Sequence, residues 1–163
     1  NDRRNACQQA VKALQNALPG ITSLRDVSPD QYKRYAQTLP EKIRMRGQHV
    51  VEEIARVEKS VRLLKAGDIT GFGKLMVQGH ESLRDLYEVS TPELNALVEI
   101  ALAQPGCYGA RLTGAGFGGC TVNLVQDDQA EAFIRNVESL YNERMGKQAG
   151  LYHCHASQGA HLI

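Results

Sequence analysis

The sequence predicts an α+β fold in which helices pack on one side of a small, mostly antiparallel sheet. Two observations lead to this prediction. From residue 4 to residue 103, apolar residues recur every three or four positions, which is the spacing of helices with one buried face. From residue 108 onwards, short β-prone runs are joined by one further helical stretch. Helices followed by strands are typical of α+β domains.

The length of the chain fits one domain. Its 163 residues, of which 42% are hydrophobic, can bury one compact core but not two. No internal repeat, linker or low-complexity segment divides the sequence. We therefore expect residues 1–163 to form a single domain. Because the chain opens on helical periodicity without an initial Met, we also expect it to be a piece of a longer polypeptide.

Helices are expected over most of the first hundred residues, separated by proline and glycine. The expected ranges are 4–18, 32–39, 41–65, 69–87 and 90–103. The apolar stripe of the long helix 41–65 consists of Ile43, Val50, Val51, Ile54, Val57, Val61 and Leu64. In the last of these helices, Ser90 can cap the N-terminus with Glu93 completing a capping box.

Three interior glycines, Gly71, Gly73 and Gly79, stand in the expected helix 69–87. Each costs about 1 kcal/mol relative to alanine, so we expect close packing of this helix against a neighbour. After residue 105 the sequence predicts strands at 108–113, 120–125 and 151–156, a helix at 129–145 and a last short strand at 160–163.

Composition excludes several classes of partner. The formal net charge of +1 gives no electrostatic reason to bind nucleic acid or an anionic membrane. No apolar run approaches the length of a membrane span. The four cysteines, at positions 7, 107, 120 and 154, form no C-x-x-C pair and stand in apolar contexts that suit small buried thiols. A reduced cytoplasmic location is therefore expected.

The segment from Gly114 to Gly119 concentrates four glycines in six positions between two β-prone runs. It matches G-x-G-x-x-G, yet a strand follows it where a dinucleotide site needs a helix, and no Lys-Ser/Thr follows as in a Walker A loop. A plain hairpin turn needs only one or two glycines. The surplus indicates that something approaches this backbone closely, either phosphate oxygens or the backbone of another loop. Thr113 adds a hydroxyl, and Arg111 on the same strand face could add a charge.

Other candidate residues favour structural roles. His153 and His155 share one face of the expected strand 151–156, but two metal ligands without a third close by indicate surface or core histidines, and no metal site is expected. His80 has no second histidine one turn away, so we interpret it as a structural histidine. Cys120 has no neighbouring base to activate it and is expected to serve packing.

The segment GARLTGAGFGGCTVNLV, residues 109–125, resembles the third signature motif of the GHMP small-molecule kinases in its galactokinase form. The resemblance extends to residues 46–57, RGQHVVEEIARV, and to residues 72–101, FGKLMVQGHESLRDLYEVSTPELNALVEIA. It runs in order from about Arg3 to the C-terminus. It implies the ferredoxin-like C-terminal domain of these kinases, with the N-terminal ATP- and sugar-binding lobe absent from this chain.

Galactokinases transfer the γ-phosphoryl group of MgATP to the anomeric hydroxyl of galactose. The resemblance therefore implies a sugar kinase of galactose metabolism, with ATP and Mg²⁺ bound mainly by the missing lobe and no catalytic residue in this chain. Its third-motif loop would brace the phosphate site, and the isolated domain would be inactive. The residues expected there are Thr113, Gly114, Ala115, Gly116, Phe117, Gly118 and Gly119, with Arg111 beside them.

Two alternatives remain open at this point. A catalytically silent relative that senses galactose and ATP and regulates transcription would share the motif. So would a related N-acetylgalactosamine kinase, because the residues that select the sugar belong to the other lobe.

Overall fold

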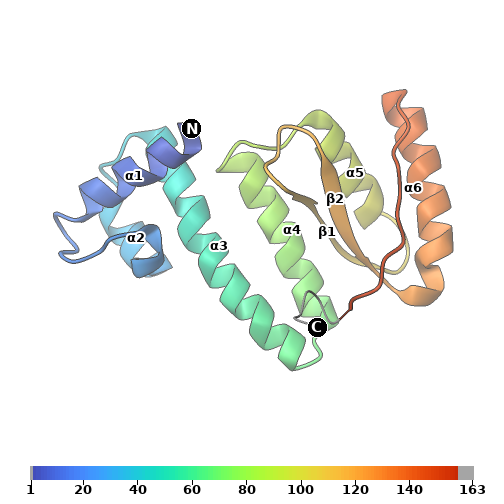
Figure 1. Ribbon diagram of the computed structural model, residues 1–163, viewed down its shortest axis with the longest axis horizontal. Coiled ribbons are helices and arrows are strands. Elements are labelled where there is room, and N and C mark those ends of the chain that lie inside the picture. Colours follow the sequence, from blue (N-terminus) through green and yellow to red (C-terminus); the bar gives the residue numbers. More distant parts are fainter. Residues whose placement is uncertain (1, 158–163) are drawn as a thin grey trace, which may run out of the picture.

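The computed structural model describes residues 2–157. Figure 1 shows a helical part formed by α1, α2 and the start of α3, followed by α4 to α6 around a small sheet. The helices are α1 (Asp2–Leu14), α2 (Pro29–Tyr35), α3 (Glu41–Lys65), α4 (Ile69–Asp85), α5 (Pro92–Leu102) and α6 (Ala130–Met145). The strands are β1 (Cys107–Thr113) and β2 (Cys120–Val125), and the short 3₁₀ turns are η1 (Leu24–Asp26) and η2 (Asp127–Gln129).

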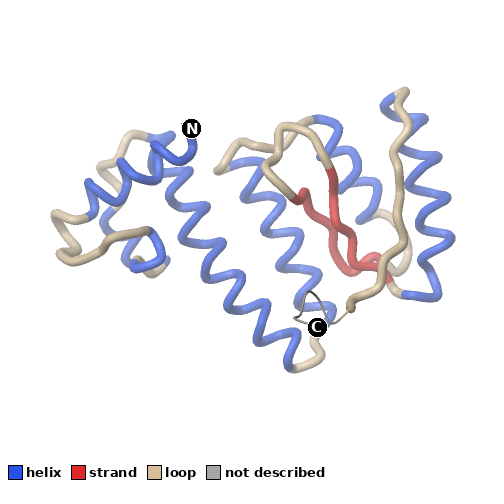
Figure 2. The backbone as a smooth tube through the Cα atoms, in the orientation of Figure 1, coloured by secondary structure: helices blue, strands red, loops and turns tan. Residues whose placement is uncertain are grey.

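The sheet is smaller than the sequence predicts. In the described residues, β1 and β2 pair antiparallel as a hairpin, with Ala110 opposite Asn123 and Thr113 opposite Cys120. The α+β class is confirmed, but the strand predicted at 151–156 is wrong, since this segment is loop in Figure 2. An alternating sequence pattern predicts an extended backbone, but an extended segment becomes a strand only where another strand pairs with it. The strand predicted at 160–163 lies outside the described residues.

The starts of α2 and α5 differ from prediction because their capping residues differ. α2 begins at Pro29 because Ser28 accepts a hydrogen bond from the Gln31 amide while its own amide donates to the Gln31 side chain. α5 is capped by Thr91, whose hydroxyl accepts from the Leu94 amide. The expected cap, Ser90, instead donates to the side chain of Asn95.

The long helix α3 has the predicted bounds, but its apolar stripe is only partly covered. Val51 is buried in the core formed with α1 and α2. Near the other end of the helix, Val57, Val61 and Leu64 are 56%, 48% and 47% exposed. The sequence pattern identifies the apolar face of a helix but does not say what covers it.

α4 and β1 approach until their backbones touch. A Cβ atom at Gly73 would collide with the backbone of Tyr108, and one at Gly109 would collide with the backbone of Gly73. The close packing expected of the α4 glycines is thus confirmed for Gly73. A Cβ at Gly79 would meet the guanidinium of Arg111, whereas Gly71 faces only the cap of its own helix.

A second core joins α5, β1 and α6. Its buried members are Ala96, Val98, Ile100, Ala101, Ala110, Phe133, Val137 and Tyr141. This core fixes β1 and therefore the hairpin that ends in the glycine loop. No helix among residues 2–157 is both long enough and apolar enough to cross a membrane.

Candidate functional site

The glycine loop, residues 114–119, closes the β1–β2 hairpin. The Thr113–Cys120 pair ends the ladder, and the backbone then turns through residues with left-handed φ. The φ values are 84° at Gly114, 77° at Gly116, 60° at Phe117, 124° at Gly118 and 98° at Gly119. Glycine adopts such angles without strain, whereas other residues do so at a cost. The concentration of glycine is thus explained by backbone conformation along nearly the whole loop.

One half of the glycine loop docks on the connection between α4 and α5. The Phe117 amide donates to the Val89 carbonyl at 2.7 Å. Gly116 lies against the same residue, and a Cβ there would collide with the Val89 backbone. For Gly116, the partner that approaches the backbone is therefore another segment of the same chain.

The other half of the glycine loop is open. A Cβ at Gly114, Gly118 or Gly119 would meet no atom within 4 Å in the described structure. Within residues 2–157, the backbone amides of these three glycines have no hydrogen-bond partner. Thr113 at the edge of the loop is also exposed. These groups are free to donate to an anion that comes close to the backbone.

Arg3, a residue that the sequence did not single out, holds the docked half in place. Its Nε donates to the Tyr87 carbonyl at 3.0 Å and its Nη2 to the Glu88 carbonyl at 2.5 Å. Its guanidinium carbon lies 5.3 Å from the centre of the Phe117 ring. Periodicity identifies Arg3 only as a helix residue, and no sequence signal indicates contacts so distant along the chain.

Arg111 pairs with a carboxylate on α3. Its Nη1 lies 2.8 Å from Oε1 of Glu53 on α3, and Glu53 also pairs with Arg56. Burial alone would raise the pKa of Glu53, but the two guanidinium groups lower it below its usual value. The Arg111 guanidinium therefore links β1 to α3, next to Gly79.

Two buried histidines brace α4. His80 Nδ1 accepts a hydrogen bond from the Leu112 amide of β1, which confirms its structural role. His49 on α3 lies 2.8 Å from the Ser82 hydroxyl and stacks on Tyr87 at 4.5 Å. Burial lowers the pKa of His49 to about 4, so this ring is neutral at physiological pH.

The cysteines only partly follow expectation. All four are free thiols. Cys7 and Cys107 are half-buried, and burial raises the pKa of both. Cys120 and Cys154 are exposed, so the packing role expected of Cys120 is wrong. Cys120 lies at the loop end of the hairpin, directly after the glycine loop, where no element of residues 2–157 covers it.

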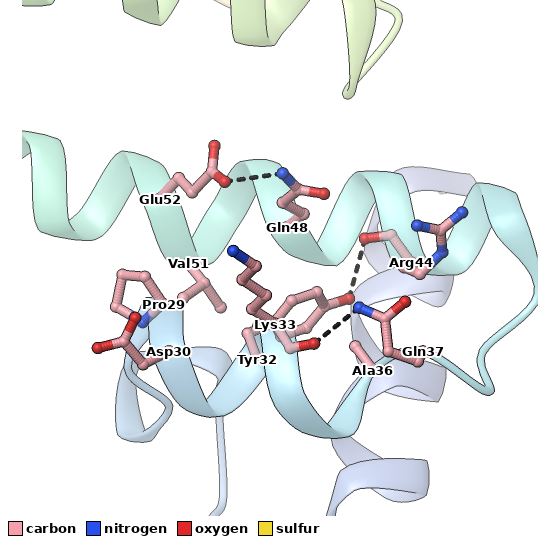
Figure 3. Close-up of a pocket in the computed structure, with 10 residues that line it drawn as sticks. All are labelled: Pro29, Asp30, Tyr32, Lys33, Ala36, Gln37, Arg44, Gln48, Val51 and Glu52. Atoms are coloured by element: carbon pink, nitrogen blue, oxygen red, sulfur yellow. Dashed lines mark hydrogen bonds between the residues drawn. The ribbon is translucent and has the colours of Figure 1, made fainter.

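A pocket of about 380 Å³ lies between α2 and α3, away from the glycine loop (Figure 3). Three hydrogen bonds join groups at its wall. The Tyr32 hydroxyl donates to the Arg44 carbonyl, Gln48 donates to Glu52, and Gln37 donates to the Lys33 carbonyl. Because this pocket shares no residue with the glycine loop or with Val89, on which the loop docks, the glycine loop remains the candidate site.

Comparison with known proteins agrees with this architecture. Residues 60–143 match the family model described as GHMP kinases C terminal. The chain is 49% identical over 159 residues to the galactokinase of Roseiflexus and 42% identical over 161 residues to that of Homo sapiens. A crystal structure of Lactococcus lactis galactokinase complexed with galactose superimposes with a TM-score of 0.87 at 38% identity, covering 93% of this chain and 39% of that one.

The family match includes the core of α4, α5, β1 and α6 together with the glycine loop, so the chain belongs to the GHMP kinase C-terminal family. Within that family it is homologous to the C-terminal region of galactokinase. The alignments cover 98% of this chain but 41% of the Roseiflexus protein, and 99% of this chain but 39% of the human one. The chain thus spans about two fifths of the length of these relatives.

Proposed function

We propose that this chain is the C-terminal lobe of a galactokinase, and that the intact polypeptide transfers the γ-phosphoryl group of MgATP to the anomeric hydroxyl of galactose. The single observation that carries the proposal is the glycine loop, which is open at Gly114, Gly118 and Gly119 and occurs in a chain homologous to galactokinases. In this proposal residues 113–119 brace the phosphate site. The sugar and most contacts to ATP belong to an N-terminal lobe.

The chemistry of the glycine loop fits phosphate oxygens. Open backbone amides and the Thr113 hydroxyl can donate hydrogen bonds to the equatorial oxygens, over which phosphoryl transfer spreads negative charge. Residues 113–119 include no carboxylate, the ligand type with which proteins usually bind Mg²⁺. We therefore assign Mg²⁺ to the other lobe. When bound there, MgATP would supply the phosphoryl group, while this chain positions its oxygens and takes no proton.

The docked half of the glycine loop sets the position of the open half. Val89 fixes Gly116 and Phe117, and Arg3 fixes the connection that carries Val89. Arg111 acts at a distance, by joining β1 to Glu53. Such preorganisation favours catalysis because the donors need no rearrangement when charge develops.

The same proposal gives the exposed face of α3 a partner. Val57, Val61 and Leu64 form an apolar stripe that is about half exposed, and an N-terminal lobe would cover it. The two-stranded sheet would then be part of a larger, ferredoxin-like sheet in the intact protein. We also propose a cytoplasmic location, which the four free thiols support.

The experiment that tests this proposal measures ATP consumption by the full-length parent polypeptide with galactose, with N-acetylgalactosamine and without sugar. The present chain serves as a control and is expected to be inactive. Turnover with galactose alone supports the proposal. Turnover with N-acetylgalactosamine alone reassigns the substrate, and galactose binding without turnover identifies a regulatory relative.

A further inference from the structure

Two histidines and an aspartate converge on the surface, at the opposite end of β2 from the glycine loop. Asp127 begins η2, the turn between β2 and α6, while His153 and His155 lie on the extended segment 151–157. Nε2 of His153 and Nδ1 of His155 are each 3.8 Å from Oδ1 of Asp127. One ligand atom from each of the three residues lies within 4.8 Å of the others.

The backbone explains why the two imidazoles meet. In an extended segment, alternate side chains point to the same face, so His153 and His155 lie together and Cys154 points away from them. Their ring centres are 4.6 Å apart with planes inclined at 51°. The sequence suggests this pair of histidines but offers no third ligand close to them along the chain. The fold supplies the third ligand, Asp127, which lies just before the N-terminus of α6.

Hydrogen bonding does not account for the cluster. A separation of 3.8 Å between nitrogen and oxygen exceeds the range of about 2.7–3.2 Å in which such bonds form. A tetrahedral zinc ion bound at about 2.0–2.2 Å would place its ligand atoms about 3.3 Å apart. Small side-chain rotations suffice to reach that spacing, because the side chains are 44% exposed at His153, 72% at His155 and 82% at Asp127.

We propose that Asp127, His153 and His155 form a binding site for a divalent late first-row transition-metal ion, and that the bound ion is Zn²⁺. Two imidazoles and one carboxylate suit Zn²⁺, whereas Ca²⁺ and Mg²⁺ prefer all-oxygen sites. Three protein ligands leave one tetrahedral position for water. The site does not depend on the proposed kinase function.

The consequence of binding would be structural. Residues 151–157 belong to no strand, and Leu151 packs at the edge of the second core. An ion shared between this segment and Asp127 would fasten the segment to the turn before α6. Binding only to the folded arrangement would stabilise it by RT ln(1 + c/Kd), where c is the concentration of free Zn²⁺, so the stabilisation grows with the concentration of free ion.

Calorimetric titration of the chain with Zn²⁺ tests the proposal. We expect one ion per chain, and we expect His153→Ala and Asp127→Asn each to weaken binding at least about tenfold, because each removes one of three ligands. Two control variants should bind as the unchanged chain does. Asp128→Asn alters the neighbouring exposed carboxylate, and Cys154→Ser alters the thiol between the two histidines.

Amide hydrogen exchange gives a second readout that does not depend on the heat of binding. Zn²⁺ should slow exchange within residues 151–157 of the unchanged chain, EDTA should restore it, and Asp127→Asn should show no slowing. The proposal is overturned if Zn²⁺ fails to bind at about 1 mM, or if binding survives in both His153→Ala and Asp127→Asn.

Discussion

The guanidinium of Arg3 lies 5.3 Å from the centre of the Phe117 ring while donating hydrogen bonds to the carbonyls of Tyr87 and Glu88. One side chain of α1 thus touches both the glycine loop and the connection on which that loop docks. Glu88 and Phe117 are also the two described residues other than glycine with positive φ. Arg3 therefore braces the two places where the backbone is most constrained.

Replacing Arg3 with alanine should loosen the glycine loop without unfolding the chain. The variant loses two hydrogen bonds to carbonyl groups and a cation–π contact, which together contribute about 1–3 kcal/mol. Chemical denaturation should show the loss, and hydrogen exchange should be faster at residues 114–119. Arg4→Ala is the control, because Arg4 is exposed on the same helix. Unchanged exchange in the loop of Arg3→Ala would contradict the bracing role.

Alanine at Gly116 and alanine at Gly118 should have different effects. At Gly116 the new Cβ collides with the Val89 backbone, so Gly116→Ala should cost about 2 kcal/mol or more. At Gly118 the space is open and only the positive φ is unfavourable, which costs about 1–2 kcal/mol. Urea denaturation of the two variants measures the difference. Equal losses of stability would show that docking on Val89 contributes little.

In the full-length parent, Gly118→Ala should lower turnover at least about tenfold, a little over 1 kcal/mol of barrier. The variant is expected to fold, and its strained backbone misplaces amides that the proposal assigns to phosphate oxygens. Gly20→Ala is a matched control, because Gly20 also has positive φ and open space but lies in another loop. Unchanged kinetics in a folded Gly118→Ala enzyme would exclude the proposed role of the loop.

Stability should fall as the pH drops below 6.5, because the buried ring of His49 resists protonation. Its folded pKa of about 4 lies below the ordinary value of 6.5, so the unfolded chain binds the proton first. Its contribution to stability is complete above pH 6.5 and is lost progressively towards pH 4, and the loss is on the order of 3 kcal/mol. Denaturation curves between pH 7.5 and 4.5 measure this, and His49→Gln should have a shallower pH dependence. His155→Gln, studied in EDTA, is the control at an exposed histidine. If stability depends on pH equally in His49→Gln and in the unchanged chain, His49 is not the cause of the pH dependence.

Sequence reasoning found the features that local chemistry determines. Glu41 to Lys65 is the predicted helix because its apolar spacing and the following Gly67 both act locally. The glycine loop was found for the same reason. The docking of Gly116 on Val89 and the approach of Asp127 to His153 could not be predicted, because they depend on how distant elements pack.

The contact between α4 and β1 should tolerate no side chain at Gly73. A methyl group there would collide with the Tyr108 carbonyl, and because backbone lies on both sides, the collision can be relieved only by moving the helix off the strand. We expect Gly73→Ala to destabilise the fold by about 2 kcal/mol or more, although alanine favours helices by about 1 kcal/mol over glycine. Gly150→Ala is the control, since its Cβ would meet only the Tyr152 side chain at 3.4 Å or more. Thermal denaturation of both variants measures the effect, and a Gly73→Ala chain as stable as the unchanged one would show that helix propensity outweighs the collision at this contact.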